Sequence, residues 1–169
     1  MTDVAGCFRQ LKISGTPLWD PKIGSPFTLL NEPDLIEKLP RTTKKASIIT
    51  GSIAAPFIRD VLLQCGSGAS VVPVKKDIAC LVTIEDLRDL DLSTLEKTVI
   101  IPGRAFVHDR EASVVLSADG IDRVVVRGPE MLTADAETSM GMTRREVLSL
   151  ELEGFADLIR VVNQYGQPG

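Results

Sequence analysis

The sequence has few aromatic residues and a single histidine. Aromatic side chains make up 4% of the 169 residues, and the one histidine is His108. Hydrophobic residues still account for 44% of the chain, so the core must be built from aliphatic side chains. No apolar run reaches the roughly 18 residues of a membrane span. The net charge of −4, without a basic stripe or a stacking platform, argues against nucleic-acid binding.

Cysteine is also sparse. Cys7, Cys65 and Cys80 are too far apart for a disulfide framework, a zinc ribbon or the three-cysteine loop of an iron–sulfur cluster. We expect Cys65 and Cys80 to be buried free thiols and assign no role to Cys7. The first ten residues, MTDVAGCFRQ, lack the pattern of a signal peptide. We therefore expect a cytoplasmic protein that makes no contact with a membrane.

The length and composition indicate one α/β domain. We expect a sheet of about five or six mixed strands, with flanking helices and a long C-terminal helix. Residues 1–45 would form an N-terminal strand at Cys7–Ile13 and an extended arm anchored by Trp19. Residues 46–106 would form the ligand-binding core, and residues 107–169 a hairpin and the last helix. Because the chain begins in a strand, we expect it to be a domain excised from a larger enzyme.

A strand–helix–strand unit covers roughly residues 46–75. The β-branched run Ala46–Thr50 predicts a strand, Gly51 a turn, and Ser52 a helix cap. Apolar residues then recur at helical spacing: Ile53, Ala54, Phe57, Ile58, Val61 and Leu62. The sequence SVVPV predicts the next strand. A crossover of this length favours a parallel, right-handed connection.

Two further apolar runs follow. Ile78–Val82 precedes Thr83, which with Asp86 forms a near capping box for a helix. KTVIIPG predicts a strand that ends at Pro-Gly. The sequence ASVVLSADGIDRVVVRG predicts two strands around a turn at Asp119-Gly120. Thr143 and Glu146 form a full capping box for the last helix, which we expect to end at Gly166.

Catalytic constellations are scarce. We expect His108 to lie in a solvent-facing turn, and the carboxylates of IEDLRDLDLSTLE to lie on a solvated helix face. What stands out is three apolar strand ends, each followed by a turn: IITGS, IACLVTIED and VIIPGRA. In open α/β sheets such carboxyl ends bind ligands. Apolar linings with backbone polar groups suit a large, flat, partly apolar cofactor, although Thr50-Gly51-Ser52 could equally be a plain turn and cap.

These stretches resemble a known family. IITGSIAAPFIRDVL, VVPVKKDIACLVTIEDL and TVIIPGRAF are similar, in order and spacing, to a C-terminal domain of certain radical-SAM proteins long catalogued as a domain of unknown function. A relative is the methanogenesis marker protein of methanogenic archaea that methylates an arginine of methyl-coenzyme M reductase. The resemblance is clear over about residues 46–106 and loose over the last helix.

The resemblance implies a cobalamin-binding domain of a B12-dependent protein-arginine C-methyltransferase. The iron–sulfur cluster and S-adenosylmethionine would belong to an N-terminal radical-SAM domain, because this chain has no CxxxCxxC loop and cannot be catalytic alone. The partners implied are that N-terminal domain and, as substrate, the alpha subunit of methyl-coenzyme M reductase. Neither nucleic acid nor a membrane is expected.

The resemblance also implies base-off cobalamin without a histidine ligand. The chain lacks the DxHxxG motif of the commoner cobalamin modules, and the relative has an aliphatic side chain beneath the metal. Leu81 occupies the matching stretch, so we expect it under the cobalt and His108 uninvolved; an ordinary core leucine is the alternative. The expected cofactor-binding residues are Thr50, Gly51, Ser52, Leu81, Val82, Thr83, Ile101, Pro102 and Gly103. None is assigned to catalysis or to direct metal ligation.

Two other functions remain open. One is a non-enzymatic module that docks another protein through the apolar face of its C-terminal helix. The other is a small free-standing enzyme, for which the sequence offers few acid–base residues.

Overall fold

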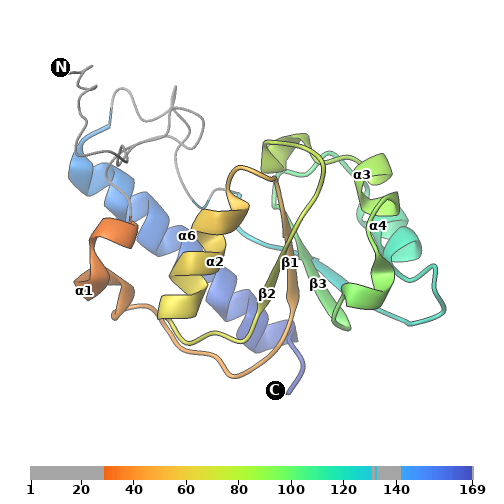
Figure 1. Ribbon diagram of the computed structural model, residues 1–169, viewed down its shortest axis with the longest axis horizontal. Helices are drawn as coiled ribbons and strands as arrows, with labels where there is room; N and C mark the ends of the chain where they lie inside the picture. Colours follow the sequence, from red (N-terminus) through yellow and green to blue (C-terminus); the bar gives the residue numbers. More distant parts are fainter. Residues whose placement is uncertain (1–28, 131, 133–141, 169) are drawn as a thin grey trace.

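A computed structural model describes residues 29–130, 132 and 142–168, and a parallel β-sheet forms its centre (Figure 1). The strands are β1 (Ser47–Thr50), β2 (Ser70–Pro73), β3 (Thr98–Ile101) and β4 (Val124–Arg127). They lie in the order β2-β1-β3-β4, and each neighbouring pair is parallel. The α/β class is therefore confirmed. The prediction of five or six mixed strands is wrong for the described residues, which form four parallel strands. The predicted strand Cys7–Ile13 and the arm around Trp19 lie outside this part of the chain.

The central strands are apolar because both faces of the sheet are covered by helices. Successive side chains point to opposite faces, so Ile48 packs into one hydrophobic cluster and Ile49 into the other. In β3, Ile100 joins the first cluster, whereas Val99 and Ile101 join the second.

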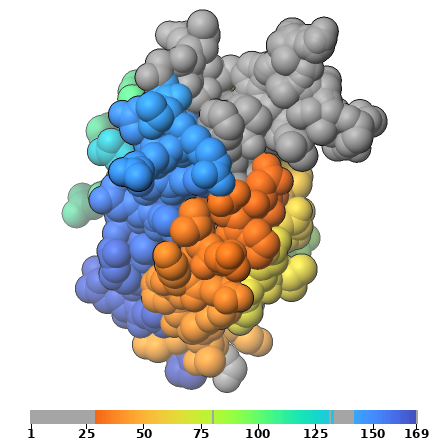
Figure 2. Space-filling model, turned by 90° about the vertical axis from the view of Figure 1, so that its left-hand side faces the viewer, coloured from red at the N-terminus to blue at the C-terminus, as the bar shows by residue number. Residues whose placement is uncertain are grey.

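The helices form one layer on each side of the sheet (Figure 1). The helical elements are η1 (Leu29–Asn31), α1 (Pro33–Ile36), α2 (Ala55–Gln64), η2 (Ala79–Leu81), α3 (Ile84–Arg88), η3 (Leu92–Thr94), α4 (Asp109–Leu116) and α6 (Arg144–Tyr165). One layer holds α2 and α6, and the other holds α3 and α4. In Figure 2 the segment that carries α1 lies between α6 on its left and the yellow region of α2 on its right.

Most of the predicted apolar face of α2 is buried as expected, whereas Ile53 and Ala54 precede the helix and are half-buried. Phe57, Ile58 and Val61 are each at most 4% exposed, and the Phe57 ring meets Phe155 of α6 edge-on at 5.5 Å between centroids. The prediction that Ser52 caps this helix is wrong: the N-cap residue is Ala54, and no side chain caps the helix. The Ser52 hydroxyl instead donates a hydrogen bond to a carboxylate in the loop after β2.

The predicted hairpin is also wrong. Ala112–Leu116 is the second half of α4, and β4 pairs in parallel with β3. Two parallel neighbours need a crossover, and α4 supplies it. Ala112 and Leu116 are fully buried one helical turn apart, so packing against the sheet outweighs the strand propensity of the two valines between them.

The C-terminal helix begins as predicted. Thr143 and Glu146 form the capping box of α6, and Gly166 is its C-cap. The next residue, Gln167, pairs with Lys45 in an antiparallel bridge just before β1. The Gln167 side-chain oxygen accepts hydrogen bonds from the amides of Lys97 and Thr98 at 2.6 and 3.1 Å. The end of the chain therefore closes the amino edge of the sheet.

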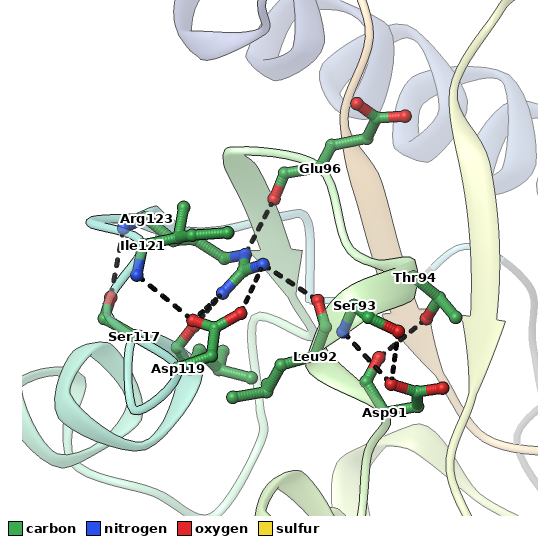
Figure 3. Close-up of polar contacts among 10 residues, drawn as sticks. Asp91, Leu92, Ser93, Thr94, Glu96, Ser117, Asp119, Ile121 and Arg123 are labelled. Atoms are coloured by element: carbon green, nitrogen blue, oxygen red, sulfur yellow. Dashed lines mark hydrogen bonds and ion pairs between the residues drawn. The ribbon is translucent and has the colours of Figure 1, made fainter.

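Arg123 closes the same edge beside β4 (Figure 3). Its side chain is 1% exposed and forms an ion pair with Asp119 at 2.7 Å. The guanidinium also donates to three backbone carbonyl oxygens, those of Leu92, Glu96 and Leu116. A buried guanidinium with all these partners joins the end of α4 to the segment that leads into β3.

Cys65 is buried, as predicted, at the end of α2. Burial raises the pKa of its thiol, and the nearby positive charge of Arg41 opposes this only in part. Cys7 and the side chain of Cys80 lie outside the described residues. In the part of the chain that the structure covers, no helix combines the length and the apolar character that crossing a membrane would require.

Candidate functional site

Four loops meet at the carboxyl edge of the sheet, which is the upper edge in Figure 1. They follow β1, β2, β3 and β4 at residues 51–54, 74–83, 102–108 and 128–130. Although β2 separates them in the sequence, β1 and β3 are neighbours, so the chain changes direction along the sheet between them. Ligands of open parallel sheets bind at such a switch point.

The turn after β1 packs tightly against the loop after β2. The amides of Ser52 and Ile53 donate to the carbonyl oxygens of Lys76 and Asp77 at 2.8 and 3.3 Å. A Cβ on Gly51 would lie 2.5 Å from the Asp77 carbonyl oxygen, so only glycine fits there. The Ser52 amide belongs to the turn that we expected to donate to a cofactor, and its hydrogen bond to Lys76 already occupies it. The exposed polar group of the turn is the Ser52 hydroxyl, 3.0 Å from the Asp77 carboxylate.

The loop after β2 crosses the end of β1. It contains η2, a single helical turn, where we predicted a third strand end. A Cβ on Gly51 would also lie 2.9 Å from the amide nitrogen of Ala79, so the start of η2 packs against the β1 turn. Leu81 is 53% exposed and Ile78 is 47% exposed, whereas Val82 is fully buried. Two apolar side chains therefore face outward at the switch point, and the alternative of a core leucine at position 81 is wrong.

Thr83 begins α3 with the predicted capping box. Its amide and hydroxyl both donate to Oδ2 of Asp86, at 2.9 and 3.1 Å, and the Lys76 ammonium lies 3.3 Å from the same oxygen. Burial of Asp86 would raise its pKa, but the Thr83 hydrogen bonds and Lys76 outweigh it and hold the pKa below the usual range. The Thr83 hydroxyl therefore donates its hydrogen bond within the first turn of α3.

The turn after β3, like the turn after β1, contains a glycine that packs closely against a neighbouring loop. Ile101 is 1% exposed, and Pro102 is half-buried. A Cβ on Gly103 would lie 2.6 Å from the carbonyl oxygen of Gly128, so this glycine also permits two neighbouring loops to approach closely. Gly103 and Gly51 therefore have a structural role that requires no ligand.

The loop from β3 to α4 presents an exposed aromatic ring. Phe106 is 83% exposed, while its amide donates to the carbonyl oxygen of Val82 at 2.9 Å. This bridge places the Phe106 backbone next to the end of the η2 segment. His108, two residues later, is the exposed N-cap residue of α4. The solvent exposure predicted for His108 is confirmed, and the structure also brings it to the carboxyl edge.

The nine predicted site residues therefore lie at one edge of the sheet, but their side chains differ in solvent exposure. The side chains of Thr50, Val82 and Ile101 are buried, so only their backbones could meet a ligand. Leu81 and Ser52 are exposed. Sequence reasoning missed Ile78 and Phe106 as surface residues. The available signal was an aromatic residue in a loop just after Pro-Gly, in a chain with only seven aromatic residues (one Trp, one Tyr and five Phe).

Within the described residues, no group of three His, Cys, Asp or Glu side chains comes together as a metal site. The edge offers apolar contact, a few polar groups and ordered backbone. No protein-family model matches the sequence, and no match is found among curated proteins.

Proposed function

We propose that the chain is a cobalamin-binding domain that holds the corrin at the carboxyl edge of its sheet. The observation that carries the proposal is Leu81, an aliphatic side chain 53% exposed on a turn that lies over the switch point. Together with Ile78 and Phe106 it offers an apolar surface for a broad, flat ring. These side chains lie on two loops whose backbones are joined by the hydrogen bond from Phe106 to Val82, and exposed apolar patches are typical of binding surfaces.

The residues present fit the lower face of a base-off corrin. Leu81 cannot donate to a metal, and in contact with the ring it would keep water away from that face. The exposed Ser52 hydroxyl and Asp77 carboxylate at the same edge could bind amide groups on the corrin rim. When bound, the corrin would supply a cobalt able to carry a methyl group. In this proposal His108 takes no part, although it lies on the same edge.

The whole-protein function is an inference from the family resemblance. We assign the chain to a B12-dependent radical-SAM methyltransferase of methanogenic archaea, located in the cytoplasm. An N-terminal domain would bind the iron–sulfur cluster and S-adenosylmethionine. The substrate would be an arginine of the alpha subunit of methyl-coenzyme M reductase. This chain would hold the methyl carrier and leave catalysis to its partner domain.

The docking alternative has less support. It needs the apolar face of α6, and the residues of that face are buried against the sheet and α2. Phe155, Leu158 and Ile159 are each at most 1% exposed. A partner could reach this face only after the helix detached from the core.

Cobalamin binding is directly testable. The 169-residue chain at tens of micromolar is mixed with hydroxocobalamin, separated from free cofactor by gel filtration, and examined by visible absorption. We expect corrinoid absorption to co-elute with the protein. If none co-elutes, the isolated chain is not a sufficient site, and failure of the chain joined to its N-terminal domain as well would reject the proposal.

Spin resonance of the cob(II)alamin state separates the two candidates beneath the metal. We expect no nitrogen coupling in the unmutated protein or in Leu81→Ala, and new nitrogen coupling in Leu81→His. His108→Ala should leave the spectrum unchanged. Nitrogen coupling that is present in the unmutated protein and lost in His108→Ala would make His108 the ligand and rule out Leu81.

A further inference from the structure

Arg127, the last residue of β4, holds the whole loop between β3 and α4. Its Nη1 donates to the carbonyl oxygens of Gly103 and Ala105 at 3.1 and 3.2 Å, and its Nη2 to that of Val107 at 2.7 Å. Its Nε donates to the carboxylate of Asp109 at 2.7 Å. One planar guanidinium thus fixes four acceptors along seven residues, which a lysine ammonium could not match.

The loop fixed in this way carries Phe106 at its centre. The backbone is held by Arg127 on one side and by the hydrogen bond from the Phe106 amide to Val82 on the other. Yet the ring is 83% exposed, so it contributes little apolar burial to the fold. A rigid backbone beneath an exposed ring lowers the entropy lost when that ring packs on a ligand.

Arg123 provides the contrast. It lies four residues earlier, at the amino edge, and its side chain is 1% exposed, against 31% for Arg127. Arg123 joins segments of the core, whereas the hydrogen bonds of Arg127 reach only the one loop and the first residue of α4. Arg123 therefore stabilises the fold, whereas Arg127 positions one loop.

We infer that Phe106 is a ligand-binding residue of the carboxyl edge and that Arg127 is its positioning residue. The inference rests on the proposed function and extends it. The ring of Phe106 would pack against the bound corrin, together with the exposed side chains of Ile78 and Leu81. Arg127 acts on binding through Phe106 and does not touch the ligand.

The test is a double-mutant cycle on cobalamin affinity, measured by visible absorption titration. Phe106→Ala should weaken binding about tenfold to a hundredfold, the range expected for loss of a buried aromatic contact. Arg127→Met should weaken binding less and should speed amide hydrogen exchange at residues 103–107. Arg127→Lys should fall between Arg127→Met and the unmutated protein. The double variant should bind no more weakly than Phe106→Ala alone.

Two control substitutions change exposed side chains of α2. Leu63→Ala removes an apolar side chain 74% exposed on α2, and Arg59→Lys alters an exposed arginine of the same helix. Neither should change affinity. If Phe106→Ala leaves affinity unchanged, or if its effect multiplies with that of Arg127→Met, the inference fails while the proposed function stands. If neither the unmutated chain nor the chain joined to its N-terminal domain binds cobalamin, both fail.

Discussion

The two edges of the sheet treat their side chains in opposite ways. At the amino edge, Arg123 is buried with its donors satisfied, and Gln167 accepts hydrogen bonds from two backbone amides. At the carboxyl edge, Phe106, Leu81 and Ile78 are between 47% and 83% exposed. One edge buries polar groups that have partners, and the other exposes apolar groups to solvent.

This difference separates stability from binding. A buried, fully paired polar group is costly to disturb because its former partners stay buried. An exposed apolar side chain can be truncated at little cost to the fold, since it gains little from folding. Substitutions at the amino edge should therefore act on unfolding, and those at the carboxyl edge on ligand affinity.

The largest expected effect is that of Arg123→Met. The substitution removes the donors of three backbone carbonyl groups, so we expect a loss on the order of 3 kcal/mol in the free energy of unfolding. Urea denaturation measures it. Arg88→Met, at an exposed arginine paired only with Glu85, is the matched control and should change stability by less than about 0.5 kcal/mol. A loss below about 1 kcal/mol for Arg123→Met would contradict the role given to the amino edge.

Gln167→Ala should have the next largest effect. It leaves the amides of Lys97 and Thr98 without their side-chain acceptor, at a cost of about 1–2 kcal/mol. Gln167→Glu keeps an oxygen in the same place and should lose less stability. Gln164→Ala, at an exposed position one turn away, should be neutral in the same urea experiment. Equal stability of Gln167→Ala and the unmutated protein would show that the tail does not close the edge.

The contacts that close the amino edge of the sheet could not be predicted from sequence patterns. The capping box at Thr143 and most of the apolar face of α2 follow from residues three or four positions apart, and these features were predicted correctly. Arg123 and Gln167 depend on partners that only the tertiary structure supplies. The predicted hairpin failed for a related reason. The valines before Asp119-Gly120 have strand propensity, but their place between two parallel strands requires a helix.

The sequence patterns predicted where the carboxyl edge lies, but they did not predict which of its side chains are exposed. Apolar strands followed by turns identified the edge, because parallel strands all end on the same side. Which side chains face outward was not encoded in those patterns. Val82 and Leu81 are neighbours in one apolar run, yet one is buried and the other exposed, since η2 turns the chain where a strand was expected.

Acid should destabilise the protein partly through the amino edge. The hydrogen bond from Arg123 holds the pKa of Asp119 below its usual value. A lowered folded-state pKa adds stability above the unfolded-state pKa of about 4, and this stability is lost as the pH falls through the folded-state value. Asp119→Asn should therefore flatten the decline in stability below about pH 4. Asp91, whose pKa is lowered by hydrogen bonds from Ser93 instead, offers Asp91→Asn as a comparison at a carboxylate that Arg123 does not stabilise. A decline as steep in Asp119→Asn as in the unmutated protein would contradict the coupling.

The smallest expected change in stability is that of Leu81→Ala, and it tests the carboxyl edge most sharply. Because Leu81 is 53% exposed, its truncation should change the free energy of unfolding by less than about 0.5 kcal/mol. Its neighbour provides the control: Val82 is fully buried, so Val82→Ala should cost at least about 1 kcal/mol. Cobalamin affinity should respond in the opposite order, falling more in Leu81→Ala than in Val82→Ala. If Leu81→Ala is instead the more destabilising of the two, Leu81 faces the core and the binding surface loses its central residue.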